Sequence, residues 1–388
     1  MEVTAEPKPT APLLAVQHAA RMLRIGGLVR IENGSEVGYA IAAEAAMSEC
    51  DHAFLASMPH GGTLVLTGQR LAALGLPIDP RAIYELPLAR APRTPGLIAM
   101  LADPTAPVDD AAIRLEGIER SSRPTALAVI ELCKLAGLLP AAILAPEGID
   151  LPVNIDSTGV PLEAITGYRR LSASTLRPVS EARVPLADAE NARIVSFRPA
   201  DGGPEQYAIL VGEPEREAAP LTRLHSECFT GDFLGSLRCD CGDQLRGAIR
   251  RMAHEGAGVL LYLAQEGRGI GLANKLRAYM LQDSGLDTVD ANHHLGFEND
   301  ERDFWAAAAM LRQLGIGRVR LLTNNPAKIA QLQQYGIEIA GRVPHIFEAN
   351  AHNRGYLLTK ALKSGHMLAV DELQQPKKSP NGARLSVV

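Results

Sequence analysis

The chain has 388 residues, a formal net charge of −5, and 46% hydrophobic but only 4% aromatic residues. This length predicts two domains with aliphatic cores, since single hydrophobic cores stop growing beyond about 250–300 residues. The mild acidity excludes a general attraction to nucleic acid or anionic membranes, so any basic binding site must be local.

No apolar run approaches the length needed to cross a bilayer, which is about 20 residues. The first residues lack the basic and apolar regions of a secretory signal. We therefore expect a soluble, cytoplasmic protein with no nucleic-acid or membrane partner. Cysteines in such a protein are more often metal ligands than disulfides.

The first half of the chain is Ala- and Leu-rich and alternates helices with strands. After an expected disordered lead over residues 1–12, residues 13–168 form the first predicted domain. Its expected elements are a helix over 15–23, strands over 28–31 and 61–68, and an apolar helix over 125–139. The basic, Ser-rich residues 169–182 are expected to be the linker.

The second predicted domain covers residues 183–368 and is followed by a mostly disordered tail over 369–388. Its expected strands are 207–211, 258–263 and 319–323, and its expected helices are 244–254, 272–282, 302–314 and 327–335. Strands that alternate with helices predict an α/β domain with its site at the strand ends. We expect a mixed α+β chain of two domains.

Three cysteines, Cys228, Cys239 and Cys241, have the spacing C-x10-C-x-C. Three soft thiolates without a fourth suit a zinc ion that keeps one position open for water, as in catalytic sites. Cys239 and Cys241 point the same way along a strand or turn, so both reach one ion. Two alternatives stay open: buried free cysteines, or disulfides, which the absence of a secretory signal disfavours.

The remaining two cysteines, Cys50 and Cys133, are expected to be ordinary core residues.

Polar segments follow the predicted strands of the second half. Residues 265–271 come directly after the strand over 258–263, and their glycines let backbone N–H groups approach an anion, beside Arg268. An ordinary strand-to-helix turn explains these glycines as well. Asn-Asn-Pro before Lys328 is a turn signal, and this lysine is either a phosphate ligand or simply solvated.

Two further segments have structural explanations of their own. The adjacent His293 and His294 are interpreted as surface residues, and neither is assigned as a ligand. Asp300 is expected to cap a helix that begins at Arg302, a role compatible with catalysis. Together with the cysteines, the polar segments predict zinc beside phosphate-binding groups, hence metal-assisted hydrolysis of a nucleotide.

Five motifs in the second half carry a resemblance to one family. They are HSEC-x10-CDCG at 225–242, QEGR at 265–268, RAY at 277–279, DERD at 300–303 and LTNNP at 322–326. In this order and spacing they resemble GTP cyclohydrolase II. The resemblance implies opening of the imidazole ring of GTP with release of formate and diphosphate. The product would be 2,5-diamino-6-ribosylamino-4(3H)-pyrimidinone 5′-phosphate, an intermediate of riboflavin biosynthesis.

The resemblance also implies roles for single residues. Cys228, Cys239 and Cys241 would hold zinc, which activates the water that attacks C8. Tyr279 would assist at the ring by hydrogen bonding or proton transfer. The expected GTP-binding residues are Arg223, Gln244, Glu266, Gly267, Arg268, Thr288, Thr323 and Lys328, of which Gln244 and Glu266 position the guanine.

Two more residues are matched to the removal of diphosphate. Asp300 is expected as general base and Arg302 as nucleophile toward the α-phosphorus. Because a guanidinium is not deprotonated at ordinary pH, electrostatic stabilisation by Arg302 is the alternative. Magnesium bound by the triphosphate and a homodimer complete the expectations.

The first half is similar to 3,4-dihydroxy-2-butanone 4-phosphate synthase, an α/β sandwich to which many bacteria fuse this cyclohydrolase. The similar segments are Ala-Ala-Glu at 42–44, Leu-Gly-Leu-Pro at 74–77 and Leu-Ala-Gly-Leu at 135–138. The His-Thr-Glu of the synthase falls near Thr-Ala-Leu at 125–127. The catalytic residues of the synthase are therefore missing here.

The acidic run of the synthase is also missing. Val37 and Tyr39 stand where acids are expected, and Glu32 and Glu36 are too few oxygen ligands for a magnesium site. We predict a domain that is inactive as the synthase and serves dimerisation, stabilisation or regulation. Three alternatives for the whole chain stay open: a ring-opening paralogue of another pathway, a silent GTP-binding regulator, and a true two-enzyme fusion.

Overall fold

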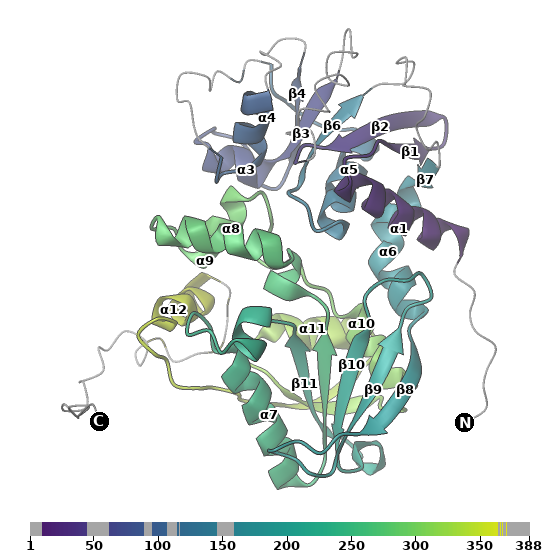
Figure 1. Cartoon of the computed structure of the whole chain (residues 1–388), viewed down its shortest axis with the longest axis vertical. Coiled ribbons are helices and arrows are strands. Elements are labelled where there is room, and N and C mark those ends of the chain that lie inside the picture. Colours follow the sequence, from purple (N-terminus) through teal and green to yellow (C-terminus); the bar gives the residue numbers. More distant parts are fainter. Residues whose placement is uncertain are drawn as a thin grey trace, which may run out of the picture.

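The structure is a computed structural model that describes residues 10–44, 62–88, 95–106, 117–145 and 159–363, together with 115, 365, 367 and 370. Residues 1–9 of the predicted lead, Cys50 and nearly all of the predicted tail lie outside the described residues. Two seven-stranded sheets with flanking helices make up the described fold, which confirms the mixed two-domain architecture (Figure 1).

The N-terminal unit contains the first sheet, whose order is β5-β4-β3-β6-β2-β1-β7. Its strands are β1 (Val29–Asn33), β2 (Glu36–Ala42), β3 (Thr63–Thr67), β4 (Ile83–Pro87), β5 (Glu119–Arg120), β6 (Ala141–Ala145) and β7 (Gly159–Pro161). Its helices are α1 (Ala11–Arg24), α3 (Gly68–Ala73), α4 (Pro95–Ala102), α5 (Pro124–Leu135) and α6 (Leu162–Ser174). Neighbouring strands are antiparallel except β1 and β7, which are parallel.

Helices cover both faces of this sheet, and the two cores that they form with it are mainly aliphatic, as the composition predicts. Apolar side chains of α1, α5 and α6 pack on one face in a core that includes the fully buried Leu23, Ile31 and Cys133. Side chains of α3 and α4 pack on the other face, around Leu64 and Ile98. Successive side chains along each strand point to opposite faces of the sheet, so the same strands contribute apolar side chains to both cores.

The C-terminal unit contains the second sheet, whose order is β14-β13-β11-β12-β10-β9-β8. Its strands are β8 (Arg177–Arg183), β9 (Ala192–Arg198), β10 (Gln206–Val211), β11 (Leu221–Ser226), β12 (Gly258–Leu263), β13 (Arg318–Leu322) and β14 (Glu338–Val343). Its helices are α7 (Cys241–Glu255), α8 (Leu272–Asp283), α9 (Thr288–His294), α10 (Trp305–Gln313), α11 (Pro326–Gln334) and α12 (Arg354–Lys363). Strands β12, β11, β13 and β14 run parallel.

The parallel part of this sheet explains the continuous apolar runs in the sequence. Strand β12 is central and almost wholly buried, because α7 packs on one face and α10 and α11 on the other. The amphipathic α7 ends at Gly256, whose φ of 91° lies in the left-handed region that stops a helix. The carboxyl ends of β11, β12 and β13 therefore meet at one edge.

Helices α8 and α9 lie between the two sheets (Figure 1). Their apolar side chains form a small core with Leu139, which comes from the N-terminal unit and is fully buried. The other buried members of this core are Ile270, Ala278, Leu281, Ala291, Leu295 and Phe297. The two halves of the chain thus share one hydrophobic cluster.

Three expectations about local structure are wrong, and two of them lie between residues 169 and 305. The predicted linker 169–182 instead forms the end of α6 and most of β8. Strand β8 is a solvent-facing edge strand that pairs with β9, and the polar composition of β8 therefore resembles that of a linker. The helix expected from Arg302 begins at Trp305, whose N–H donates to Asp303 Oδ1 at 3.1 Å. Asp300 instead pairs with Arg302.

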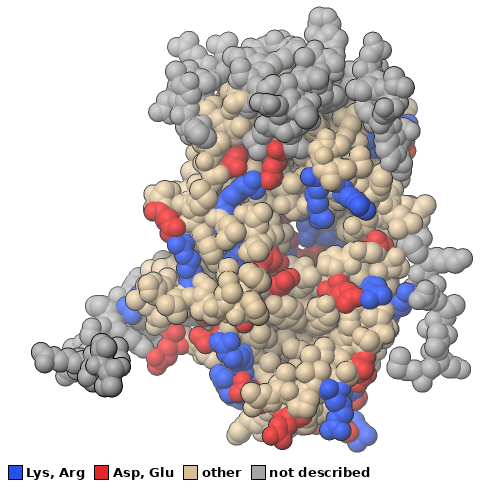
Figure 2. All heavy atoms as spheres, viewed as in Figure 1, with Lys and Arg blue, Asp and Glu red and all other residues tan. Residues whose placement is uncertain are grey.

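Acidic and basic side chains are mixed over the face seen in Figure 2, in keeping with the small net charge. No helix among the described residues combines the length and the apolar character needed to span a membrane. The predicted end of the lead is also revised, since α1 already begins at Ala11.

Candidate active site

One pocket lies at the carboxyl ends of β11, β12 and β13, the edge where parallel strands of an α/β sheet place ligand sites. The residues predicted from the sequence that line it are Arg223, Cys228, Cys239, Cys241, Gln244, Glu266, Gly267, Arg268, Tyr279, Thr288, Arg302, Thr323 and Lys328. Asp300 is not among the lining residues and reaches the pocket through its ion pair with Arg302.

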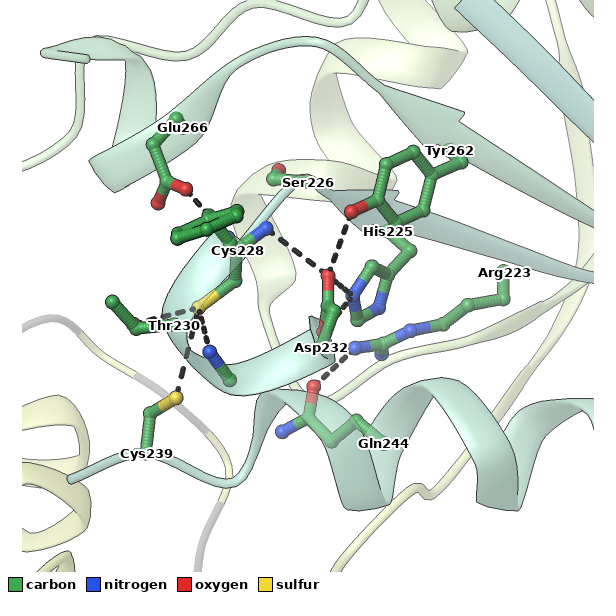
Figure 3. Close-up of polar contacts among 12 residues, drawn as sticks. Arg223, His225, Ser226, Cys228, Thr230, Asp232, Cys239, Gln244, Tyr262 and Glu266 are labelled. Carbon is green, nitrogen blue, oxygen red and sulfur yellow. Dashed lines mark hydrogen bonds and ion pairs between the residues drawn. The ribbon is translucent and has the colours of Figure 1, made fainter. Parts of the chain in front are cut away.

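Three thiols gather at one side of this pocket. The Sγ atoms of Cys228, Cys239 and Cys241 lie within 4.8 Å of one another, and those of Cys228 and Cys239 are 3.7 Å apart (Figure 3). Cys228 follows β11, Cys239 stands in the turn before α7, and Cys241 is the first residue of that helix. Zn–S bonds of about 2.3 Å in a tetrahedron put sulfurs about 3.8 Å apart, so the donor set fits zinc.

The backbone around the thiols is shaped to leave room for them. Gly231 donates its N–H to Cys228 Sγ at 3.3 Å. A Cβ at position 231 would lie 2.6 Å from Cys239 Sγ and 3.0 Å from Cys228 Sγ, which is closer than real contacts allow. Hydrogen bonds from the other two thiols, with Lys275 adding to them, hold the pKa of Cys228 well below that of an ordinary cysteine. Cys228 is therefore favoured as a thiolate, the form that ligates metals, whereas hydrogen bonding to this sulfur raises the pKa of Cys239 and Cys241.

A buried carboxylate, Asp232, orients the cysteine segment. It accepts hydrogen bonds from the Cys228 N–H at 3.0 Å and the Tyr262 hydroxyl at 3.0 Å, and lies 3.0 Å from His225 Nε2 (Figure 3). His225 stacks on Tyr262 with ring centroids 5.6 Å apart. Burial lowers the pKa of His225, although Asp232 opposes this shift. Hydrogen bonds to Asp232 thus hold the segment that carries Cys228 against β11 and β12.

Lys275 connects the thiols with the residues after β12. Its Nζ donates to Cys228 Sγ at 3.1 Å, to Thr230 Oγ1 at 2.9 Å and to Glu266 Oε1 at 2.8 Å. Although burial works to lower it, the pKa of Lys275 is raised by Glu266 and Cys228. Glu266 also accepts the N–H of Phe229 at 2.6 Å. The charged ammonium therefore joins two sides of the pocket.

The turn after β12 has unusual backbone geometry. Gly267 and Arg268 have φ values of 63° and 61°, and Arg268 is the one described non-glycine residue with a positive φ. Such a conformation costs free energy and is most often kept at functional sites. Arg268 donates to Asn299 O at 3.2 Å, whereas its buried Nη2 has no hydrogen-bond partner among the described residues. An anion bound in the pocket would supply the hydrogen-bond acceptor that Arg268 Nη2 lacks.

Arg223 is a second buried guanidinium. It donates to Leu322 O at 3.2 Å and to Gln244 Oε1, and its buried Nε has no partner among the described residues. Burial lowers the pKa of Arg223 to about 10, with Asp240 opposing the shift, so the side chain stays charged near neutral pH. Arg223 is buried and Arg268 is half-buried, and each has one buried nitrogen without a partner among the described residues, which favours an anionic ligand in this pocket.

Asp300 and Arg302 form an ion pair beside the pocket. Arg302 Nε donates to Asp300 Oδ1 at 2.7 Å and its Nη1 reaches Ser226 Oγ at 3.3 Å. Partial burial works to raise the pKa of Asp300, but Arg302 lowers it overall. The carboxylate is thus ionised near neutral pH, and the guanidinium that it pairs with remains charged.

The other predicted residues have varied surroundings. Tyr279 points its hydroxyl toward Thr230 Oγ1 at 3.5 Å, and burial raises its pKa. Thr323 Oγ1 accepts the N–H of Asn325 at 3.0 Å. Lys328 donates to Leu224 O at 2.7 Å. Thr288 opens α9 and lines the pocket.

Sequence analysis missed four residues that shape the site: His225, Asp232, Tyr262 and Lys275. Lys275 had a usable signal, because it stands four residues before Tyr279 on a predicted helix and so shares its face. Asp232 had none, since only the fold brings it beside His225 and Tyr262.

Comparison with known proteins gives one matching family model, GTP cyclohydrolase II, over residues 177–344. The chain is 48% identical over 371 residues to GTP cyclohydrolase-2 of Azospirillum brasilense, covering 93% of this chain and 96% of that protein. It is 39% identical over 363 residues to the riboflavin biosynthesis protein RibBA of Salinispora arenicola, covering 87% and 83%.

Other matches are partial. RibBA of Parabacteroides distasonis is 40% identical over 267 residues, which cover 66% of this chain and 65% of that protein. A crystal structure of RibBX, a two-domain 3,4-dihydroxy-2-butanone 4-phosphate synthase from A. baumannii, matches with a TM-score of 0.29 and 17% identity, covering 79% of this chain and 93% of that chain. That score is too low for any argument about the fold.

Proposed function

The chain belongs to the GTP cyclohydrolase II family, and we propose that it opens the imidazole ring of GTP in a zinc-dependent hydrolysis. Formate and diphosphate leave, and 2,5-diamino-6-ribosylamino-4(3H)-pyrimidinone 5′-phosphate enters riboflavin biosynthesis. The observation that carries this proposal is the cluster of three thiols, within 4.8 Å of one another, in a pocket that also holds Arg223 and Arg268. Soft ligands for zinc stand there beside cations for a triphosphate.

The metal ligands in this proposal are Cys228, Cys239 and Cys241. Zinc bound by three protein ligands supplies Lewis-acid chemistry that makes water a nucleophile near neutral pH. Lys275 and the Gly231 N–H both donate to Cys228 Sγ, and they stabilise its thiolate form. Tyr279 keeps its proton near neutral pH because burial raises its pKa, and it would donate a hydrogen bond to the opening ring.

The remaining residues bind and orient GTP. Gln244 and Glu266 would position the guanine, while Gly267, Thr288 and Thr323 would contact the nucleotide. Arg223, Arg268 and Lys328 would face the phosphates, with Mg²⁺ held by the triphosphate. Asp300 and Arg302 would act at the α-phosphorus. Their 2.7 Å pairing favours electrostatic stabilisation by Arg302 over attack by a guanidinium.

The N-terminal unit is, in this proposal, inactive as the dihydroxybutanone phosphate synthase. The two acids that remain of the acidic run of the synthase are engaged: Glu32 pairs with Arg30 at 2.8 Å, and Glu36 accepts from Thr125 Oγ1 at 3.0 Å. Hard cations need clustered free oxygen ligands, which these engaged carboxylates do not supply.

Assembly and location belong to the same proposal. Exposed Phe233, Leu234 and Leu237 form an apolar surface near the thiols, which a second copy of the chain would cover in a homodimer. Analytical ultracentrifugation tests whether the chain forms this homodimer, and a monomer at every concentration would exclude the dimer.

Three thiolate ligands need a reducing compartment, which favours the cytoplasm.

The test is mass spectrometry of the products formed from GTP, Mg²⁺ and ribulose 5-phosphate in one reaction. Formate, the diaminopyrimidine phosphate and unchanged ribulose 5-phosphate are the expected result. Dihydroxybutanone phosphate would show that the N-terminal unit is an active enzyme. Untouched GTP would overturn the proposed function and favour a GTP-binding regulator.

A further inference from the structure

The segment that carries Asp300 and Arg302 is held from both sides. It connects α9 with α10, and the residues on its pocket side pair with each other and with Ser226. Its backbone also bonds to the turn after β12, because the Glu301 N–H donates to Arg268 O at 3.1 Å. Its other side faces the N-terminal unit.

Glu301 stands between the two expected catalytic residues and turns its carboxylate away from them. Its Oε1 lies 2.7 Å from Lys134 Nζ, and the two side chains are only 9% and 13% exposed. The same Oε1 accepts the N–H of Glu298 at 2.8 Å. An ion pair this buried is costly to break, since the carboxylate would be left without its counter-charge.

A second cation of the N-terminal unit holds the same segment. Arg169, on α6, donates to the backbone carbonyl of Glu301 at 3.2 Å and lies 3.4 Å from Asp303 Oδ2. Gln69, on α3, donates to Glu298 Oε1. Contacts from α3, α5 and α6 therefore fix side chains and backbone on both sides of Asp300 and Arg302.

Helix α8 is held in the same way from the face opposite the pocket. Arg277 pairs with Glu44 at 2.7 Å and with Asp103 at 3.2 Å, and the buried Asn274 donates to Gly137 O at 3.1 Å. The pocket-facing residues of this helix include Tyr279. Both elements that bring candidate catalytic groups to the pocket thus contact the N-terminal unit, and Figure 1 shows α8 beside that unit.

We propose that Lys134 of the N-terminal unit is a positioning residue for the cyclohydrolase reaction, acting through its ion pair with Glu301 on the segment that carries Asp300 and Arg302. This inference rests on the proposed function. Lys134 touches neither substrate nor metal ligands; it fixes the backbone from which both catalytic side chains project. Misplacement of reacting groups by about 1 Å can cost about a hundredfold in rate, so a lost anchor should lower kcat.

The experiment compares full-length Lys134→Met, Lys134→Arg and a control, Arg30→Met, which removes another ion-paired cation of the N-terminal unit. We expect kcat for diphosphate release, the step assigned to Asp300 and Arg302, to fall at least about tenfold in Lys134→Met, with KM for GTP and zinc content unchanged. Lys134→Arg should recover most of kcat, and Arg30→Met should match the native chain. A kcat within about twofold of native in Lys134→Met, or a loss confined to KM, would overturn the proposal.

A second measurement does not depend on turnover. Hydrogen exchange of the amides at 298–304 should be faster in Lys134→Met than in Arg30→Met, and unchanged protection would overturn the proposal. Should Lys134→Met fail to fold, Glu301→Gln removes the same pair with less change of shape and is judged by the same criteria. A native chain without GTP turnover would overturn the proposed function, and the exchange result would then still decide whether Lys134 holds the segment that carries Asp300 and Arg302.

Discussion

The α-carbon of Gly231 lies so close to Cys239 that an added Cβ would stand 2.6 Å from the cysteine sulfur. The glycine is therefore required by its neighbours rather than by its backbone angles. Its N–H also donates to Cys228 Sγ. Gly231 thus sets how closely two of the three thiols approach each other.

Replacing Gly231 with alanine should weaken zinc binding at least about tenfold, because the new methyl group separates the sulfurs. Zinc affinity measured by competition with a chromophoric chelator checks this. Gly317→Ala is the matched control, since a Cβ there meets nothing within 4 Å. Equal zinc affinity in the two variants would show that the thiols are not the metal site.

Replacing Cys239 with serine should remove zinc and formate release together, because a neutral hydroxyl is a poor substitute for a thiolate ligand. Cys133→Ala is the control, since Cys133 is buried in the core of the N-terminal unit. Metal analysis of both purified variants, followed by a formate assay, makes the comparison. Retained activity in Cys239→Ser would be incompatible with the metal assignment.

Replacing Tyr279 with phenylalanine should slow formate release by about a hundredfold while GTP affinity changes little, because only the hydroxyl is lost. Single-turnover formate release and calorimetric titration with GTP separate the two effects. Tyr335→Phe is the control, since that ring stacks on Trp305 at 3.7 Å outside the pocket. A parallel loss of affinity and rate would assign Tyr279 to binding instead.

His345 should make the fold sensitive to mild acid. Burial, with Arg223 adding, lowers its pKa from 6.5 to about 4, and its Nε2 lies 2.8 Å from Gln244 O. Between these pH values only the unfolded chain takes up the proton, so the free energy of unfolding falls as the pH drops, by about 3 kcal/mol in all. Above pH 6.5 His345 is neutral in both the folded and the unfolded chain, so none of this stability is lost there.

Urea unfolding at about pH 7.5 and about pH 5 tests this. His345→Gln should lose less stability than the native chain over that interval, because the amide does not titrate. The exposed His352 provides the control, and His352→Gln should behave like the native chain. A variant with the native pH dependence would assign the acid sensitivity to other groups.

Most of the elements in the C-terminal unit follow from local patterns. Strand β12 was expected over 258–263 and has those bounds, because a central parallel strand is apolar on both faces. The helix expected over 272–282 is α8, one residue longer. The spacing of the three cysteines likewise predicted a cluster that the fold brings together.

What could not be predicted depends on contacts between distant residues. The polarity of β8 arises from its place at a sheet edge, so its composition resembles a linker. The pairing of Asp300 with Arg302 replaces the expected helix cap, because Asp303 is closer to the first helical turn. Asp232 and Lys134 have no sequence signal at all, since their partners come from other elements.

The core around Leu139 makes the two halves of the chain depend on each other. A fully buried leucine of the N-terminal unit completes a cluster whose other buried side chains all come from residues 270–297. Without the first half of the chain that cluster would be open to water, at a cost in free energy that does not depend on any chemistry of the N-terminal unit. We therefore expect residues 183–363 expressed alone to be less stable than the same residues within the full chain.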